Sequence, residues 1–219
     1  AKMLFPALEI ARKSWRAALN PLPSLAQLGA RLSPQAYWRL YALQAKRQGL
    51  KAWVLSFSLD CDTLRDAECV LQVDERLRAR GISPVYAVHA ELLGQHLDVY
   101  GQLRDRGAQF MNHGWVTHTL WDPEQGYRSI HFYDRMAREE VRADLVRGHE
   151  ALCKFLGKAP LGARVPHFGT FQQPGELAFL YETLSGLGYR YSSSTLPMIS
   201  AVRGPLHRAG GICEIPVSG

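Results

Sequence analysis

The chain has 219 residues, of which 47% are hydrophobic and 21% are charged, a composition typical of a folded globular protein. No apolar run is long enough to cross a membrane as a helix, and charged residues interrupt the N-terminal stretch, which argues against a secretory signal. The four cysteines include no Cys-x-x-Cys pair, which argues against a zinc finger or a disulfide framework. We therefore expect a cytoplasmic protein.

The net charge of +6 is concentrated at the N-terminus. Residues 1–51 contain nine Lys and Arg against a single acid, Glu9, whereas residues 52–219 contain 17 basic and 19 acidic residues. A chain whose main part is slightly acidic is not expected to bind nucleic acid. A basic N-terminal segment instead fits peripheral contact with an anionic membrane, which would place the protein at the inner face of that membrane.

Residues 1–50 are predicted to form a basic helical extension. Apolar residues recur at helical spacing between Leu4 and Leu19, and Asn20-Pro21-Leu22-Pro23 is expected to end this first helix. Ser33-Pro34 predicts the start of a second helix, which should end near Gly49. Two interpretations are open: both helices pack on the main domain, or at least one of them faces a membrane.

From Trp53 onward, short apolar strands alternate with helices, which predicts a single domain over residues 51–219. The expected strands are an apolar run from Trp53 to about Ser58 and residues 82–88, 108–111, 162–165, 189–192 and 212–217, and the expected helices are residues 63–80, 92–106, 136–156 and 175–187. Repeated units of this kind favour a parallel sheet or an α/β barrel. In such barrels the functional residues lie at the C-terminal ends of the strands.

The first polar cluster follows the first strand, where Asp60 and Asp62 are separated by one residue. Two carboxylates on the same side of a strand repel each other unless a cation or an arginine compensates their charge. The alternative is a simple strand end in which Asp62-Thr63 caps the next helix. Two further clusters also follow strands: His113 and His118 after residues 108–111, and Arg164 within residues 162–165.

Two histidines in one short segment are typical of metal ligation, although each could equally be a solvated or core histidine. Asp62 would add an oxygen ligand from a neighbouring strand end. One Asp and two His with open positions is a catalytic pattern rather than a closed structural one. Arg164, if it faced the two carboxylates, would fix one of them in its ionised form.

In this order, the segments resemble the polysaccharide deacetylase family, also called carbohydrate esterase family 4. The matching motifs are Asp60-Cys61-Asp62, the stretch from His113 to His118, Arg164-Val165-Pro166, and residues 189–194 and 214–218, which are similar to the family's later strands. The resemblance covers about residues 52–219. It implies a distorted (β/α) barrel of about seven strands.

The resemblance also implies a function. A divalent metal, usually zinc, would be held by Asp62, His113 and His118, with Asp60 as the general base and Arg164 as its partner. The reaction would remove N-acetyl groups from a cell-surface polysaccharide or from its glycolipid or saccharide precursor.

The sequence departs from the family pattern in two places. The two histidines are five residues apart rather than four, so a shared metal would need a loop or a π-bulge between them. The family's final Leu-x-His motif, whose His is the general acid, is not found, which would leave the barrel without its last strand. His167 is the candidate substitute for that acid. Two other functions therefore remain open: a non-catalytic carbohydrate-binding module, and a hydrolase of a non-sugar amide bond.

Overall fold

The computed structural model describes residues 21–52 and 55–217. The predicted helix over residues 4–19, together with Trp53 and Val54, lies outside the described residues. The helices are α2 (Pro21–Leu32), α3 (Pro34–Arg47), α4 (Leu64–Arg78), α5 (Ala90–Gln95), α6 (Leu97–Asp105), the 3-10 helix η1 (Tyr133–Arg135), α7 (Arg138–Leu156), α8 (Pro174–Gly186) and α9 (Pro197–Arg203). The strands are β1 (Ser58–Cys61), β2 (Val85–Val88), β3 (Gln109–Asn112), β4 (Thr119–Asp122), β5 (Gly126–Ser129), β6 (Gly162–Ala163), β7 (Tyr191–Ser192), β8 (His207–Ala209) and β9 (Ile212–Glu214).

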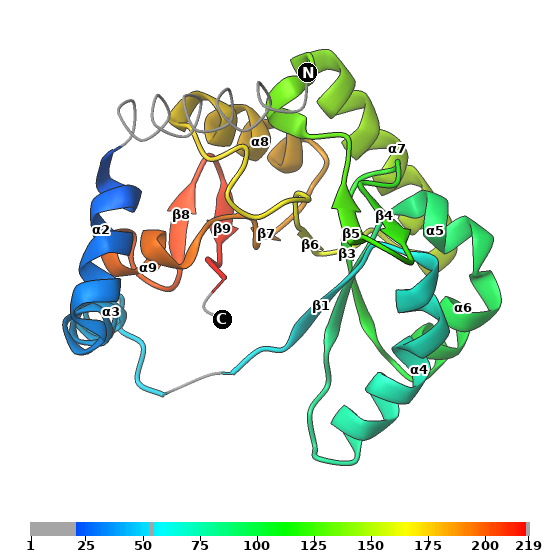
Figure 1. The fold of residues 1–219 in the computed structure, drawn as a ribbon, viewed down its shortest axis with the longest axis horizontal. Coiled ribbons are helices and arrows are strands. Elements are labelled where there is room, and N and C mark those ends of the chain that lie inside the picture. The colour runs from blue at the N-terminus through cyan, green and yellow to red at the C-terminus, as the bar shows by residue number, and fades with distance from the viewer. Residues whose placement is uncertain (1–20, 53–54, 218–219) are drawn as a thin grey trace.

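The main sheet has seven strands in the order β1-β2-β3-β6-β7-β9-β8. All neighbouring strands are parallel except β8 and β9, which are antiparallel. In Figure 1 the helices α4, α6, α7 and α8 follow one another around the outside of the sheet. The predicted α/β class with a mostly parallel, seven-stranded, barrel-like sheet is confirmed. Within the described part of the chain, β1 and β8 do not pair, so the sheet is open between them.

The core has two parts, one on each side of β6. The first packs Tyr86, Leu103 and Phe110 beneath α4 and α6. The second packs Leu145 and Leu180 with other apolar residues of α7, α8 and β9. Because the strands from β1 to β9 are paired in parallel, the polar residues at their C-terminal ends lie at one edge of the sheet.

The N-terminal region contains a helix that was not predicted. Helix α2 covers Pro21–Leu32, and the end of the helix predicted before Asn20-Pro21-Leu22-Pro23 lies outside the described residues. Proline is accepted in the first helical turn because the N–H groups there have no acceptor within the helix. The helix after Ser33-Pro34 forms as predicted, with Ser33 Oγ accepting a hydrogen bond from Ala36 N (3.4 Å).

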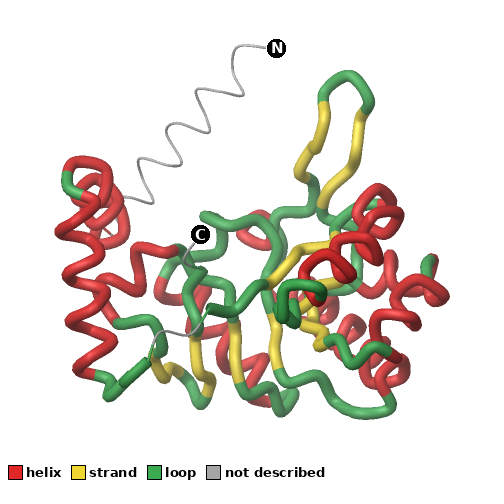
Figure 2. The backbone as a smooth tube through the Cα atoms, turned by 90° about the horizontal axis from the view of Figure 1, so that it is seen from below, coloured by secondary structure: helices red, strands yellow, loops and turns green. Residues whose placement is uncertain are grey.

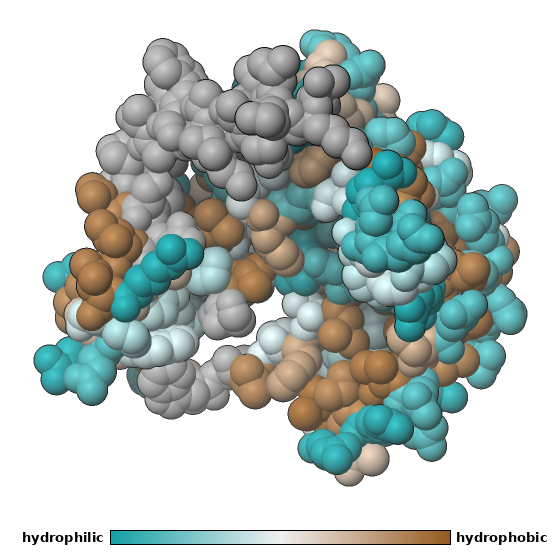
Figure 3. All heavy atoms as spheres, viewed as in Figure 1, coloured by the Kyte–Doolittle hydropathy of each residue, from teal (hydrophilic) through white to brown (hydrophobic). Residues whose placement is uncertain are grey.

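Helix α3 packs on α9, as do parts of α2 (Figure 1). Tyr37 Oη donates to Pro197 O (3.1 Å), and Gln48 Nε2 donates to Arg203 O (2.8 Å). The outer side of α2 remains apolar, with Leu25, Leu28 and Leu32 exposed (Figure 3). None of the helices in the described ranges combines the length and the apolar character of a membrane span.

Several elements were missed or misplaced by the sequence analysis. The helix predicted over residues 92–106 is divided at His96 into α5 and α6. The hairpin β4–β5, the helix α9 and the strand β8 were not predicted. The hairpin carries exposed aromatic residues on both strands instead of a clear apolar and polar alternation, and β8 and α9 are short, so no local pattern indicated them.

Candidate active site

Asp60 and Asp62 lie at the C-terminal edge of the sheet, as their position in the sequence predicted. Asp60 belongs to β1 and is paired with Ala87 of β2, and Asp62 directly follows the strand. The side chains of both are about one quarter exposed. Their partners differ, because Asp60 contacts Arg164 and Asp62 contacts His113.

Arg164 follows β6 and is buried, and its guanidinium is held on several sides. Nη1 donates to Asp60 Oδ1 at 2.7 Å, and Nη2 donates to Ser58 Oγ at 2.6 Å and to Ser193 Oγ at 2.9 Å. Nε donates to Ser193 O at 3.0 Å. A charge-assisted hydrogen bond from a fixed guanidinium orients the Asp60 carboxylate.

The segment between His113 and His118 is a loop, which is one of the two arrangements that their spacing required. Gly114 has a φ of 87°, and any side chain at this position would collide with the carboxylate of Asp144 and the hydroxyl of Tyr133. The two imidazole rings are 6.3 Å apart between centroids. The loop therefore brings both histidines to the same edge of the sheet as Asp62.

Both histidines are fixed through Nδ1. His113 Nδ1 donates to Arg164 O (2.7 Å), and His118 Nδ1 donates to His131 O (3.0 Å). In the neutral form of each ring, the proton on Nδ1 leaves the lone pair on Nε2, which is the usual arrangement of a metal-binding histidine. His113 Nε2 lies 3.2 Å from Asp62 Oδ1, and His118 Nε2 lies 3.8 Å from Asp144 Oδ2.

The pKa values of Asp62 and His113 are shifted by their contact. Burial would raise the pKa of Asp62, but the contact with His113 and its positive charge outweigh burial and lower the pKa to about 2. Burial would lower the pKa of His113, but the Asp62 carboxylate outweighs it and the pKa is raised. A metal ion bound by both groups would take the place of the His113 proton, because a metal-binding histidine is neutral.

The donor set fits a divalent metal by its chemistry and by two orphaned atoms. Asp62 Oδ1 and His118 Nε2 are buried, and neither has a hydrogen-bond partner among the described residues. Within residues 21–52 and 55–217, no three His, Cys, Asp or Glu side chains lie in an arrangement that could already hold a metal ion. Two buried atoms with free lone pairs beside His113 are the ligands that such an ion would satisfy.

His167 lies beside the two histidines but is differently held. Its backbone has a φ of 62°, and its ring is 5.8 Å from the ring of His118 between centroids. Nε2 donates to Ile130 O at 2.7 Å, which leaves Nδ1 free to exchange a proton. Burial lowers the pKa of His167. All six residues singled out by the sequence analysis are therefore at one edge of the sheet.

Three further residues at this edge were missed. His89 follows β2 and donates from Nε2 to Asp62 O (2.8 Å), and burial lowers its pKa to about 4. Asp144 of α7 accepts from the backbone of Trp115 and Val116 and from the hydroxyl of Tyr133. The strand-end rule would have found His89. Asp144 and Tyr133 gave no local signal, because they reach the site from helices.

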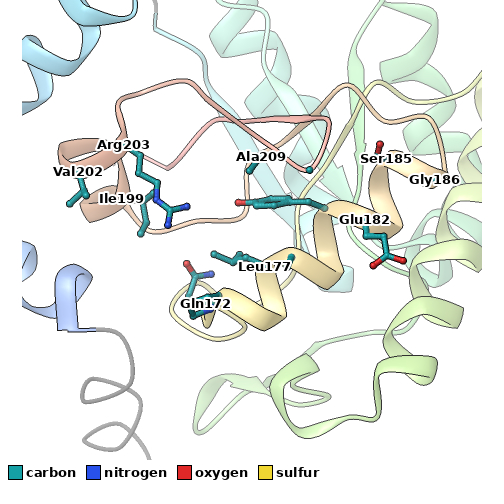
Figure 4. Close-up of a pocket in the computed structure, with 13 residues that line it drawn as sticks. Gln172, Leu177, Glu182, Ser185, Gly186, Ile199, Val202, Arg203 and Ala209 are labelled. Atoms are coloured by element: carbon teal, nitrogen blue, oxygen red, sulfur yellow. The ribbon is translucent and has the colours of Figure 1, made fainter.

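Two cavities differ in their relation to the candidate site. The larger, of about 550 Å³, lies between α8 and α9 and is lined by residues such as Leu177, Ile199 and Arg203 (Figure 4). It contains none of the candidate site residues. The smaller, of about 280 Å³, is lined by Asp62, His89 and residues of β4. Of these two cavities, the smaller is placed to admit a substrate to the polar edge of the sheet.

Comparison with known proteins supports the fold. No protein-family model matches the sequence, and no curated protein matches it. A solved structure assigned as a polysaccharide deacetylase of Mycobacterium smegmatis is similar, with a TM-score of 0.53 and 17% identity, covering 76% of this chain and 61% of that one. The chain therefore has the fold of a polysaccharide deacetylase, as the motifs predicted.

Two other solved structures are similar with TM-scores below 0.5. One is the allantoinase PuuE (TM-score 0.49, 16% identity), and the match covers 70% of this chain and 44% of the PuuE chain. The other is a family 4 carbohydrate esterase of Streptomyces lividans in complex with acetate (TM-score 0.46, 15% identity), covering 64% of this chain and 60% of its own. The chain spans about half of the length of these structures.

Proposed function

We propose that the protein is a metal-dependent hydrolase that removes N-acetyl groups from a saccharide, either a cell-surface polysaccharide or its glycolipid or saccharide precursor. The observation that carries the proposal is the pair of histidines with anchored Nδ1 atoms beside Asp62: His113 Nε2 lies 3.2 Å from Asp62 Oδ1, and the buried His118 Nε2 has no hydrogen-bond partner among the described residues. The deacetylase fold and the adjacent ion pair of Asp60 and Arg164 support it.

In this proposal each residue at the edge of the sheet has one task. Asp62, His113 and His118 would hold a divalent metal, for which zinc is the first candidate. Such an ion lowers the pKa of water to about 7 and polarises the amide carbonyl. Asp60 accepts the proton of the attacking water while Arg164 holds its carboxylate in place. His167, once its ring carries a proton on both nitrogens, donates the proton on Nδ1 to the leaving amine, so that amide and water give amine and acetate.

The test is amine release from an N-acetylated chito-oligosaccharide by purified protein. We expect release that a chelator abolishes and added Zn²⁺ restores. Saccharide binding without amine release would instead indicate a non-catalytic carbohydrate-binding module. Release from small non-sugar amides but not from saccharides would indicate a different C–N hydrolase.

We predict that His113 and His118 bind one metal despite their five-residue spacing. Replacing either with Ala should lower the metal content of the purified protein, because each supplies one nitrogen ligand. Both ring nitrogens should come within roughly 2.0–2.2 Å of a zinc ion in a metal-bound crystal structure. An ion held by His113 and a residue other than His118, such as Asp144, would overturn this assignment.

We further predict that the basic extension, residues 1–50, contributes to contact with the inner face of a membrane. Its excess of basic residues and the exposed Leu25, Leu28 and Leu32 support this prediction. Each basic residue near an anionic surface adds about 1 kcal/mol of binding free energy. Replacing Arg12, Lys13 and Arg16 with Gln should therefore reduce co-sedimentation with phosphatidylserine vesicles.

The control for the extension is an equal loss of charge elsewhere, with Arg76, Lys158 and Arg190 replaced by Gln. If the control loses as much binding as the variant, or if the unaltered chain never sediments with the vesicles, α2 and α3 are packing elements only.

A further inference from the structure

A cleft of about 280 Å³ opens directly beside the candidate active site. Its lining includes Asp62 and Trp121 of β4, with Arg65 and Gln95 also in its wall. Figure 2 shows the β4–β5 hairpin standing out from the body of the molecule. A proposed metal ligand and an exposed aromatic residue therefore line the same cleft.

The hairpin is fixed to the active-site edge at its base. Thr119 Oγ1 donates to Asp62 Oδ2 (3.4 Å), and the backbone N of Ile130 donates to His118 O (2.7 Å). Trp121 is only two residues from Thr119 on the same strand. A ligand held by Trp121 would therefore be held at a defined distance from Asp62.

Arg65 and Trp121 form a stacked pair. The guanidinium carbon of Arg65 is 4.2 Å from the centroid of the Trp121 ring, and Tyr127 packs against the ring edge at 4.9 Å. Arg65 forms no ion pair with any described side chain, and its stacking on Trp121 holds the guanidinium in place. A stacked guanidinium keeps its in-plane N–H donors available for a phosphate or a carboxylate.

The remaining cleft wall suits a sugar. Leu64 and Leu120 are apolar and exposed, Trp121 is 37% exposed, and the exposed Gln95 side chain has no hydrogen-bond partner among the described residues. Such a wall offers an amphipathic ring for the faces of a sugar and an amide for its hydroxyl groups.

We propose that Arg65 and Trp121 form a subsite for an oxyanion, so that the substrate is an N-acetylated saccharide that carries a phosphate or carboxylate group near the acetylated sugar. The inference rests on the function proposed above and narrows its substrate class. Trp121 contacts the sugar ring and supports Arg65, and Arg65 binds the oxyanion. Gln95 hydrogen-bonds a sugar hydroxyl.

The test compares binding of three saccharides to the metal-loaded protein by calorimetry. N-acetylglucosamine is the neutral probe, N-acetylglucosamine 1-phosphate carries a phosphate, and N-acetylmuramic acid carries a carboxylate. Arg65→Met keeps the apolar stem but removes the donors, and should weaken binding of the preferred anionic probe about tenfold or more, with less than about a twofold effect on the neutral one. Trp121→Ala should weaken all three.

The matched control is Arg128→Met, which removes the same charge from β5 of the same hairpin, outside the cleft. Unchanged affinity for both anionic probes in Arg65→Met, or an equal loss in Arg128→Met, overturns the subsite even if deacetylation is observed. Conversely, Arg65-dependent binding of an anionic probe without any amine release upholds the subsite and refutes the proposed catalytic function.

Discussion

Replacing Asp62 with Asn is expected to remove metal and activity together, whereas replacing Asp60 with Asn should leave the metal in place. Asp62 Oδ1 is the buried, orphaned oxygen beside His113, and an amide there is a poorer ligand because it carries no charge. Asp60 faces Arg164 instead, and Asn has nearly the same size. Loss of the proton acceptor should slow amine release by on the order of 10²–10⁴.

Arg164 provides the companion measurement. Arg164→Lys keeps a positive charge but loses the forked contacts with Asp60, Ser58 and Ser193, so the metal should remain while turnover falls. Metal content and turnover are measured on all three variants. If Asp60→Asn loses the metal and Asp62→Asn keeps it, the two roles are exchanged. If every variant retains full activity, this edge of the sheet is not the active site.

Replacing Asp74 with Ala should destabilise the fold by about 3 kcal/mol, the largest stability effect that we predict. The Asp74 side chain is fully buried in α4, where it accepts from Arg78 Nε at 2.8 Å and from Tyr86 Oη at 2.9 Å. Arg106 approaches the same carboxylate at 3.4 Å. Alanine would leave the buried Tyr86 hydroxyl and a partly buried guanidinium without their acceptor.

The measurement for Asp74 is thermal unfolding, in which a loss of this size lowers Tm by about 6–12 °C. Glu75→Ala is the matched control, because Glu75 is the next residue of α4 and is exposed. Asp74→Asn should lie between the two, since it can still accept from Tyr86. A Tm for Asp74→Ala equal to that of the Glu75 control would show that the ion pair adds no stability.

The alternation of the parallel strands with the longer helices was predictable because its causes are local, whereas the β4–β5 hairpin, α9 and β8 were missed. Apolar runs of strand length and glycines after helices act within a few residues, and Gly157 does end α7 in a left-handed conformation (φ 67°). The placement of Asp60, His113 and Arg164 at strand ends followed from the same alternation, since parallel strands all end at one edge of a sheet. The deacetylase-like fold could be inferred from the order of these motifs.

Contacts between distant segments could not be predicted. Nothing near β9 indicates that it lies between β7 and β8, and nothing near Asp144 indicates that it contacts His118, 26 residues away along the chain. The stacking of Arg65 on Trp121 likewise joins a helix to a hairpin that no local pattern revealed. Which residues lie at strand ends could be predicted, because that depends on neighbours along the chain. Which of them meet depends on how the sheet and its helices pack, so it was not predictable from local patterns.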